Sequence, residues 1–114
     1  MKEIDWSSLS FGYMKTDYNV RCWYRNGAWG EIEVSSEETL NIHMAATCLH
    51  YGQEAFEGLK AYRCPDGKVR VFRMDENAAR LQSSCRGIMM PEMPTEKFEE
   101  MVSKVVRLNE AYIP

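Results

Sequence analysis

The sequence predicts an α+β domain, in which an antiparallel β-sheet is followed by two C-terminal helices that pack on one face of the sheet. Apolar and polar residues alternate with period two in several runs of the first two thirds of the chain. Asn-Gly and Pro-Asp-Gly turn sequences follow or separate these runs. Beyond residue 74, apolar residues instead recur every three or four positions, the spacing of amphipathic helices.

The first predicted element is a hairpin. Residues 20–24 alternate as a half-buried strand does, and Asn26-Gly27 tolerates the positive φ angles of a tight turn. Ile32 and Val34 alternate with acidic residues on the expected return strand. A third strand is predicted at residues 40–44 because the alternation resumes there.

A second hairpin and two helices complete the prediction. Pro65-Asp66-Gly67 is a turn sequence between the expected strands "GLKAYR" and "KVRVFR". Asp75 is a good N-cap for a helix, and Thr95 can cap another after Pro91 and Pro94. The apolar residues of the first helix are Ala78, Leu81, Cys85 and Ile88, and those of the second are Phe98, Met101, Val102, Val105, Leu108 and Tyr112.

Composition and charge exclude several classes of function. At 114 residues the chain is expected to form one domain. Its net charge of −3 gives no electrostatic reason to expect nucleic acid or an anionic membrane as a partner. The N-terminal sequence MKEIDWSS lacks the apolar run of a signal peptide, and no run approaches the roughly 18 apolar residues that cross a bilayer. We therefore expect a cytoplasmic protein.

The cysteines and histidines show no metal-binding pattern. The four cysteines are widely spaced and form no C-x-x-C pair, and neither histidine has ligand spacing to a cysteine: Cys22, Cys48, Cys64, Cys85, His43 and His50. The sequence predicts reduced thiols and no metal site.

Considered one at a time, the residues indicate little chemistry. Lys60 could form a Schiff base with a carbonyl cofactor, although a strand lysine with a solvated ammonium is the commoner case. Arg80 could bind a phosphate, although a solvated helix arginine is commoner. Phe56 and Tyr51 would ordinarily be core aromatics. The pattern of residues alone therefore predicts an α+β domain and no particular activity.

The stretch Leu49–Arg63 is unusual because it contains two glycines, which weaken a strand unless a backbone or ligand approaches closely. It supplies the first of four ordered motifs: H-Y-G-Q-x-x-F-E-G-L-K-A-Y-R, D-G-K-V-R-V-F-R, N-A-A-R-L-Q-S-S and M-P. This order resembles branched-chain amino acid aminotransferases, which are fold-type IV enzymes dependent on pyridoxal 5′-phosphate. The resemblance extends from about Phe11 to Pro114, and Met74, where many members have proline, is one departure.

The resemblance implies that residues 1–114 are the small N-terminal domain of such an enzyme. It places no catalytic residue in this chain, because the Schiff-base lysine and the acid that pairs with the pyridine nitrogen lie in a larger domain expected after Pro114. The implied reaction transfers an amino group between leucine, isoleucine or valine and 2-oxoglutarate, as in branched-chain amino acid biosynthesis. The chain alone is expected to be inactive.

Three positions carry over from the resemblance. Arg80 matches the residue that binds the cofactor phosphate, which suits a permanently charged guanidinium. Phe56 matches the aromatic residue that lines the pocket for the substrate side chain, where an apolar wall favours a branched substrate. Tyr51 matches a substrate-site tyrosine that reaches the active site of the partner subunit, which implies a homodimer.

Two other interpretations stay open on the sequence. One is a D-amino acid aminotransferase or aminodeoxychorismate lyase, although F-E-G-L-K-A-Y-R is the branched-chain form of this segment. The other is a non-catalytic binding or dimerisation module.

By alternation, Phe56, Gly58, Lys60 and Tyr62 should share one face of the chain, and Leu59 and Ala61 should lie on the other. The pattern does not say which face meets the cleft.

Overall fold

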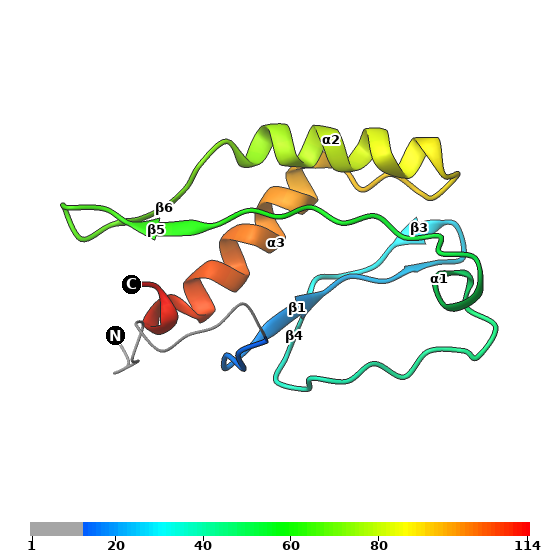
Figure 1. The fold of residues 1–114 in the computed structure, drawn as a ribbon, viewed down its shortest axis with the longest axis horizontal. Helices are drawn as coiled ribbons and strands as arrows, with labels where there is room; N and C mark the ends of the chain where they lie inside the picture. The colour runs from blue at the N-terminus through cyan, green and yellow to red at the C-terminus, as the bar shows by residue number, and fades with distance from the viewer. Residues whose placement is uncertain (1–12) are drawn as a thin grey trace.

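The computed structural model describes residues 13–114 (Figure 1), so the expectation about the N-terminal sequence MKEIDWSS lies outside the described residues. In chain order the elements are β1 (Asn19–Arg21), β2 (Tyr24–Arg25), β3 (Ala28–Trp29), β4 (Glu33–Ser35), α1 (Thr47–His50), β5 (Ala61–Arg63), β6 (Val69–Val71), α2 (Met74–Gly87), α3 (Thr95–Leu108) and the short 3-10 helix η2 (Glu110–Tyr112). Small antiparallel sheets and two main helices confirm the predicted α+β class.

The first predicted hairpin is present, and its turn is the predicted one. Asn26 and Gly27 have φ angles of 54° and 79°, which places both residues in the left-handed region that such a turn requires. β2 pairs with β3 beside this turn, and β1 pairs with β4 further along, with Val20 opposite Val34. The expected strand at residues 20–24 is therefore divided into β1 and β2.

The second hairpin also forms around its predicted turn. β5 pairs antiparallel with β6, with Ala61 opposite Val71. The turn is closed by a hydrogen bond of 2.8 Å from the Gly67 amide to the Cys64 carbonyl, and Gly67 has a φ of 83°. Both strands are shorter than the segments "GLKAYR" and "KVRVFR".

The predicted strand at residues 40–44 is wrong. These residues form no regular element and all of them are exposed. Strand pairing among the described residues is divided among the two-stranded ladders β1–β4, β2–β3 and β5–β6, and none of these includes residues 40–44. Alternation alone cannot form a strand, because the ladder needs a partner for its backbone groups. The short helix α1 follows instead.

Both helices form near their predicted positions, but the predicted caps are wrong. Arg73, with a φ of 55°, occupies the N-cap of α2, and Asp75 lies within the first turn. Thr95 is the first residue of α3, and Pro94 takes the cap position. Asp75 still favours its helix, because a negative charge in the first turn interacts well with the helix dipole.

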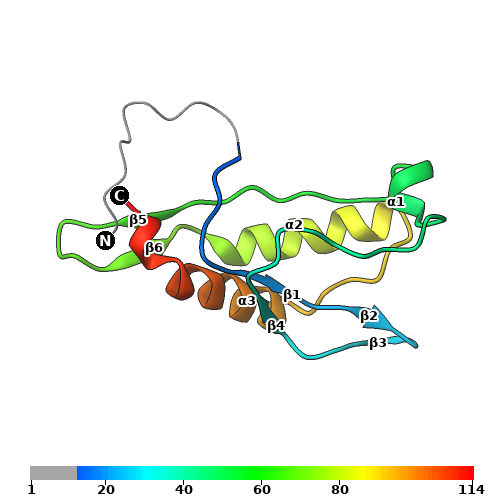
Figure 2. The same ribbon diagram turned by 90° about the horizontal axis from the view of Figure 1, so that it is seen from below.

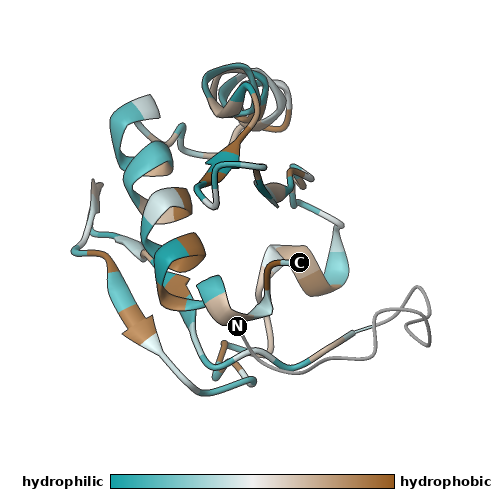
Figure 3. Cartoon of the chain, turned by 90° about the vertical axis from the view of Figure 1, so that its left-hand side faces the viewer, coloured by the Kyte–Doolittle hydropathy of each residue, from teal (hydrophilic) through white to brown (hydrophobic). Residues whose placement is uncertain are grey.

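The helices pack together and on the first hairpin. α2 packs against α3, and α3 packs against β1 (Figures 1 and 2). The extended segment of residues 51–60 runs beside α2 in both views. In Figure 3, α3 carries hydrophilic residues on its outer side and apolar residues toward the middle of the molecule, as its predicted stripe requires. No helix in residues 13–114 is both long and apolar enough to cross a membrane.

The apolar core of the described residues is thin. Its buried members are Ala78 and Cys85 on α2, with 1% and 6% of their surface exposed. The predicted apolar residues of the second helix are only half-buried, and the last of them, Tyr112, lies in η2: Phe98, Met101, Val102, Val105, Leu108 and Tyr112. Burial of apolar surface is the main favourable term in folding. Because these apolar side chains stay half-exposed, the described residues gain only part of that stabilisation.

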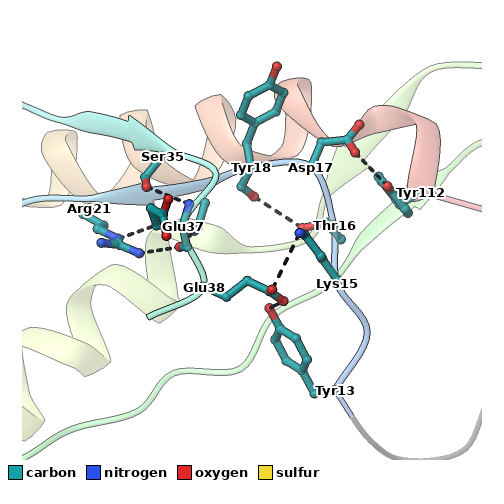
Figure 4. Close-up of polar contacts among 11 residues, drawn as sticks. Tyr13, Lys15, Thr16, Asp17, Tyr18, Arg21, Ser35, Glu37, Glu38 and Tyr112 are labelled. Atoms are coloured by element: carbon teal, nitrogen blue, oxygen red, sulfur yellow. Dashed lines mark hydrogen bonds and ion pairs between the residues drawn. The ribbon is translucent and has the colours of Figure 1, made fainter. Parts of the chain in front are cut away.

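Polar contacts fix the segment that enters β1 (Figure 4). The Tyr13 hydroxyl donates to the Glu38 carboxylate at 2.9 Å, and the Tyr112 hydroxyl donates to Asp17 at 2.9 Å. Buried Asn109, just after α3, accepts from the Tyr18 amide at 3.0 Å and donates to the Tyr18 carbonyl at 2.9 Å. The side chain of Asn109 thus bonds both backbone groups of Tyr18, as a neighbouring strand would.

Candidate functional site

The segment that precedes β5 presents two different faces. Along residues 53–63, odd-numbered residues are half-buried and even-numbered residues are exposed. This confirms that Phe56, Gly58, Lys60 and Tyr62 share one face, because side chains of an extended chain alternate. The shared face is the open one.

A hollow of about 540 Å³ lies on this open face, and we call it the aromatic hollow. Its lining residues are Phe56, Gly58, Leu59, Lys60, Tyr62, Phe72 and Asn77. Phe56 is 88% exposed, so it is not the core aromatic that its residue type alone would predict. A Cβ atom on Gly58 would lie 3.4 Å from the Phe56 ring, so any side chain there would contact that ring.

On the opposite face of the same segment, Glu57 binds two residues of α2. One carboxylate oxygen accepts a hydrogen bond of 2.7 Å from Arg80 Nη2 and one of 2.8 Å from Asn77 Nδ2. The other oxygen accepts a bond of 2.7 Å from Arg80 Nε. Only 7% of the Glu57 side chain is exposed, whereas 67% of the Arg80 side chain is exposed. The two residues therefore form a bidentate ion pair in which the carboxylate is shielded from solvent and the guanidinium is exposed.

The charges of this pair reinforce each other. Hydrogen bonding from Arg80 lowers the pKa of Glu57, and the Asn77 bond acts in the same direction against the opposing effect of burial. The Glu57 carboxylate raises the pKa of Arg80 in return. Both groups are therefore ionised at neutral pH.

Arg80 still has one free edge toward solvent. Its Nε and Nη2 atoms point at Glu57, and Nη1 makes no hydrogen bond to any residue in the range 13–114. An exposed guanidinium edge of this kind can donate to an anionic group.

Asn77 connects Arg80 to the aromatic hollow. It lines the hollow and donates at 3.2 Å to the Gly58 carbonyl, in addition to its bond to Glu57. Arg80 follows Asn77 by three residues on α2, so both lie on the same side of the helix. Arg80 does not line the hollow, but it bonds Glu57, which is the chain neighbour of Phe56.

Tyr51 lies elsewhere. It follows α1, is 82% exposed, and lines a separate hollow of about 450 Å³. The other residues of that hollow are Thr47, Gly52, Gln53 and Ile88, none of which lines the aromatic hollow. Tyr51 is therefore no core aromatic either, and within one chain it does not join Phe56 and Arg80.

The remaining candidates show no second reactive cluster. Lys60 is exposed, consistent with the solvated ammonium of an ordinary lysine. The four cysteines are free thiols, of which Cys48 is exposed and Cys85 is buried. Residues 13–114 contain no group of three potential metal ligands.

Glu57 and Asn77 are the site residues that sequence reasoning missed. Both stand inside the motifs that carried the resemblance, but neither received a role. A signal was present, because alternation places Glu57 opposite Phe56, and a spacing of three residues places Asn77 beside Arg80 on one helix face. The pattern does not reveal that these two faces meet.

Comparison with known proteins shows which class of enzyme this chain is similar to. The relatives found by sequence are aminotransferases that match the chain along almost its whole length. No protein-family model matches it. The chain is similar in particular to branched-chain-amino-acid aminotransferases, which confirms the resemblance drawn from its motifs.

Three of these relatives illustrate the extent of the match. The enzyme of Haemophilus influenzae is 44% identical over 113 residues, which cover 99% of this chain and 33% of the relative. The enzyme of Helicobacter pylori is 42% identical, and the match again covers 99% of this chain and 33% of the relative. The enzyme of Mycolicibacterium smegmatis is 42% identical, and the match covers 100% of this chain and 31% of the relative. The chain thus spans about a third of the length of the curated relatives it matches.

Proposed function

We propose that this chain is the N-terminal small domain of a branched-chain-amino-acid transaminase that uses pyridoxal 5′-phosphate. The observation that supports this most strongly is the match along nearly the entire chain to enzymes of that name. The geometry of the described residues agrees with it, because Phe56 lines an open hollow and the exposed cation Arg80 bonds Glu57, the chain neighbour of Phe56.

The residues present fit the cofactor and its substrates in kind. A phosphate needs a donor with permanent charge, and Arg80 offers an exposed guanidinium edge. A branched aliphatic side chain needs an apolar wall, and Phe56 offers an exposed ring. When bound, pyridoxal phosphate supplies the electron sink that lets an amino group move between an amino acid and a 2-oxo acid.

Each residue then has one task. Arg80 holds the phosphate and so fixes one end of the cofactor. Phe56 covers the substrate side chain and excludes water from it, and Tyr51 does the same from the neighbouring subunit of a homodimer. The proton-transferring lysine and the acid beside the ring nitrogen belong to a larger domain that follows Pro114. The full protein then acts on leucine, isoleucine or valine and 2-oxoglutarate in the cytoplasm, as part of amino-acid biosynthesis.

The proposal is tested on the full-length protein that contains this chain. Purified protein is assayed for transfer to 2-oxoglutarate from L-leucine and, separately, from D-alanine. We expect turnover of L-leucine and none of D-alanine. Turnover of D-alanine alone would identify a D-amino acid aminotransferase instead, and turnover of neither would contradict a transaminase of either kind.

A further inference from the structure

We infer that Glu57 is a positioning residue, which orients Arg80 toward the cofactor phosphate and fixes the segment that carries Phe56. The inference rests on the proposed function and deepens it. It assigns one carboxylate to two tasks, because Glu57 lies between the helix that bears Arg80 and the chain that forms the wall of the aromatic hollow.

The first task follows from the two-point contact. An exposed arginine on a helix samples many rotamers, and ordering it costs conformational entropy on binding. Here Nε and Nη2 are each held at 2.7 Å by Glu57, which fixes the plane of the guanidinium. The free Nη1 edge therefore has a defined direction before any anion arrives.

The second task follows from the backbone of the neighbouring segment. Residues 54–60 belong to no strand or helix, and within the described part of the chain their backbone makes no hydrogen bond to other backbone groups. Among the same residues, hydrogen bonds reach this segment only at Glu57 and at the Gly58 carbonyl, and all of them come from Asn77 and Arg80. Phe56 and Gly58 are direct chain neighbours of Glu57, so this clamp sets their position.

A different role for Glu57 would be that of a competitor which gives up Arg80 when phosphate binds. Burial argues against it. If Arg80 turned away, the Glu57 side chain, 7% exposed, would lose two charge-assisted hydrogen bonds and keep only the one from Asn77. A buried charge left without its partner is strongly destabilising. The arrangement in which Arg80 stays on Glu57 and binds phosphate with its other edge avoids this cost.

The test compares pyridoxal 5′-phosphate with pyridoxal, which lacks the phosphate, by equilibrium dialysis against the full-length protein. The ratio of the affinity for pyridoxal 5′-phosphate to the affinity for pyridoxal isolates the phosphate contact from the rest of the site. We expect Glu57→Gln to lower this ratio roughly tenfold and to leave the affinity for pyridoxal unchanged. The matched control is Glu54→Gln, because Glu54 is exposed in the same segment and contacts no described residue through a hydrogen bond or ion pair; its ratio should equal that of the wild type.

A second comparison separates positioning from a general structural defect. In an Arg80→Ala background the arginine is gone, so adding Glu57→Gln should change the ratio no further. A ratio in Glu57→Gln that equals or exceeds the wild-type value would overturn the inference, as would an equal loss of pyridoxal affinity. An unchanged ratio in Arg80→Ala would overturn it together with the phosphate role of Arg80, and a wild-type protein that binds neither compound would overturn the proposed function itself.

Discussion

At the scale of single residues, Arg80 and Glu57 form one ion-paired unit. The arginine is exposed and the carboxylate is buried, so the pair presents a fixed positive edge to solvent and keeps its negative partner beneath. A lone guanidinium on a helix would offer the same charge without the same direction. This difference is why the geometry favours a binding role for Arg80 over that of a solvated surface arginine.

Replacing Arg80 by Ala in the full-length protein should weaken binding of pyridoxal 5′-phosphate by about one to two orders of magnitude, because charge-assisted hydrogen bonds are lost. An absorbance titration measures the affinity. Arg86→Ala is a suitable control, since Arg86 is an exposed arginine of the same helix that pairs with Glu92 instead. Equal affinities for the wild type and Arg80→Ala would remove Arg80 from the site.

Phe56→Ala should lower kcat/KM for leucine more than kcat/KM for glutamate in the full-length protein. The exposed ring offers apolar area that a branched side chain covers, whereas the carboxylate of glutamate needs polar partners elsewhere. Steady-state kinetics with both substrates measure the two losses. Phe72→Ala is a comparison at the same hollow, on the other side of the β5–β6 hairpin. Equal losses for both substrates would make Phe56 a residue of folding and not of specificity.

The Glu57–Arg80 pair should make stability depend on pH in one direction. The folded-state pKa of Glu57 is lowered, so its contribution is fully present above the ordinary glutamate value of about 4.3 and is lost as pH falls through the lowered value. Denaturant unfolding of wild type and Glu57→Gln should therefore differ by a constant amount above about pH 5 and converge in acid. A difference that grows toward low pH would contradict the pairing.

The sequence predicted part of this candidate site, whose role stays a prediction. Arg80 and Phe56 were found through the motifs that contain them, and the shared face of Phe56, Gly58 and Lys60 followed from alternation. Glu57 was missed because the contact that defines its role joins segments more than twenty residues apart. Local periodicity says which way a side chain points, but not what lies there.

At the scale of elements, local signals were reliable where a single residue type determines the geometry. Gly27 and Gly67 both adopt the positive φ that their turns demand, so both hairpins form where predicted. The strand predicted at residues 40–44 failed because its pattern needed a partner strand that the fold does not supply. Asp75 failed as a cap because α2 already begins at Met74, directly after a left-handed Arg73.

Asn109 should stabilise the packing of α3 against β1. Its side chain bonds both backbone groups of Tyr18 and the Val105 carbonyl, and it is buried. Asn109→Ala leaves these groups without partners and should cost about 1–3 kcal/mol of unfolding free energy, measured by urea denaturation. Asn41→Ala, at an exposed position outside regular structure, should change stability little. A neutral Asn109→Ala would mean that water replaces the clamp.

At the scale of the whole molecule, the described residues leave much apolar surface uncovered. Aromatic side chains around the hollow are more than half exposed, namely Phe56, Tyr62 and Phe72. The core is correspondingly thin, and the chain spans about a third of the length of its relatives. Large exposed apolar patches mark surfaces that normally face a partner or another domain. We therefore expect the isolated chain to self-associate.

We propose that this chain holds part of a pyridoxal phosphate site and that the lysine which performs the chemistry belongs to another domain. The direct measurement is to mix the purified chain with pyridoxal 5′-phosphate, reduce with borohydride and determine by mass spectrometry which lysines are modified, with a parallel assay for leucine turnover. We expect sparse labelling spread over several lysines and no turnover. Stoichiometric labelling of Lys60 together with turnover of leucine would contradict it.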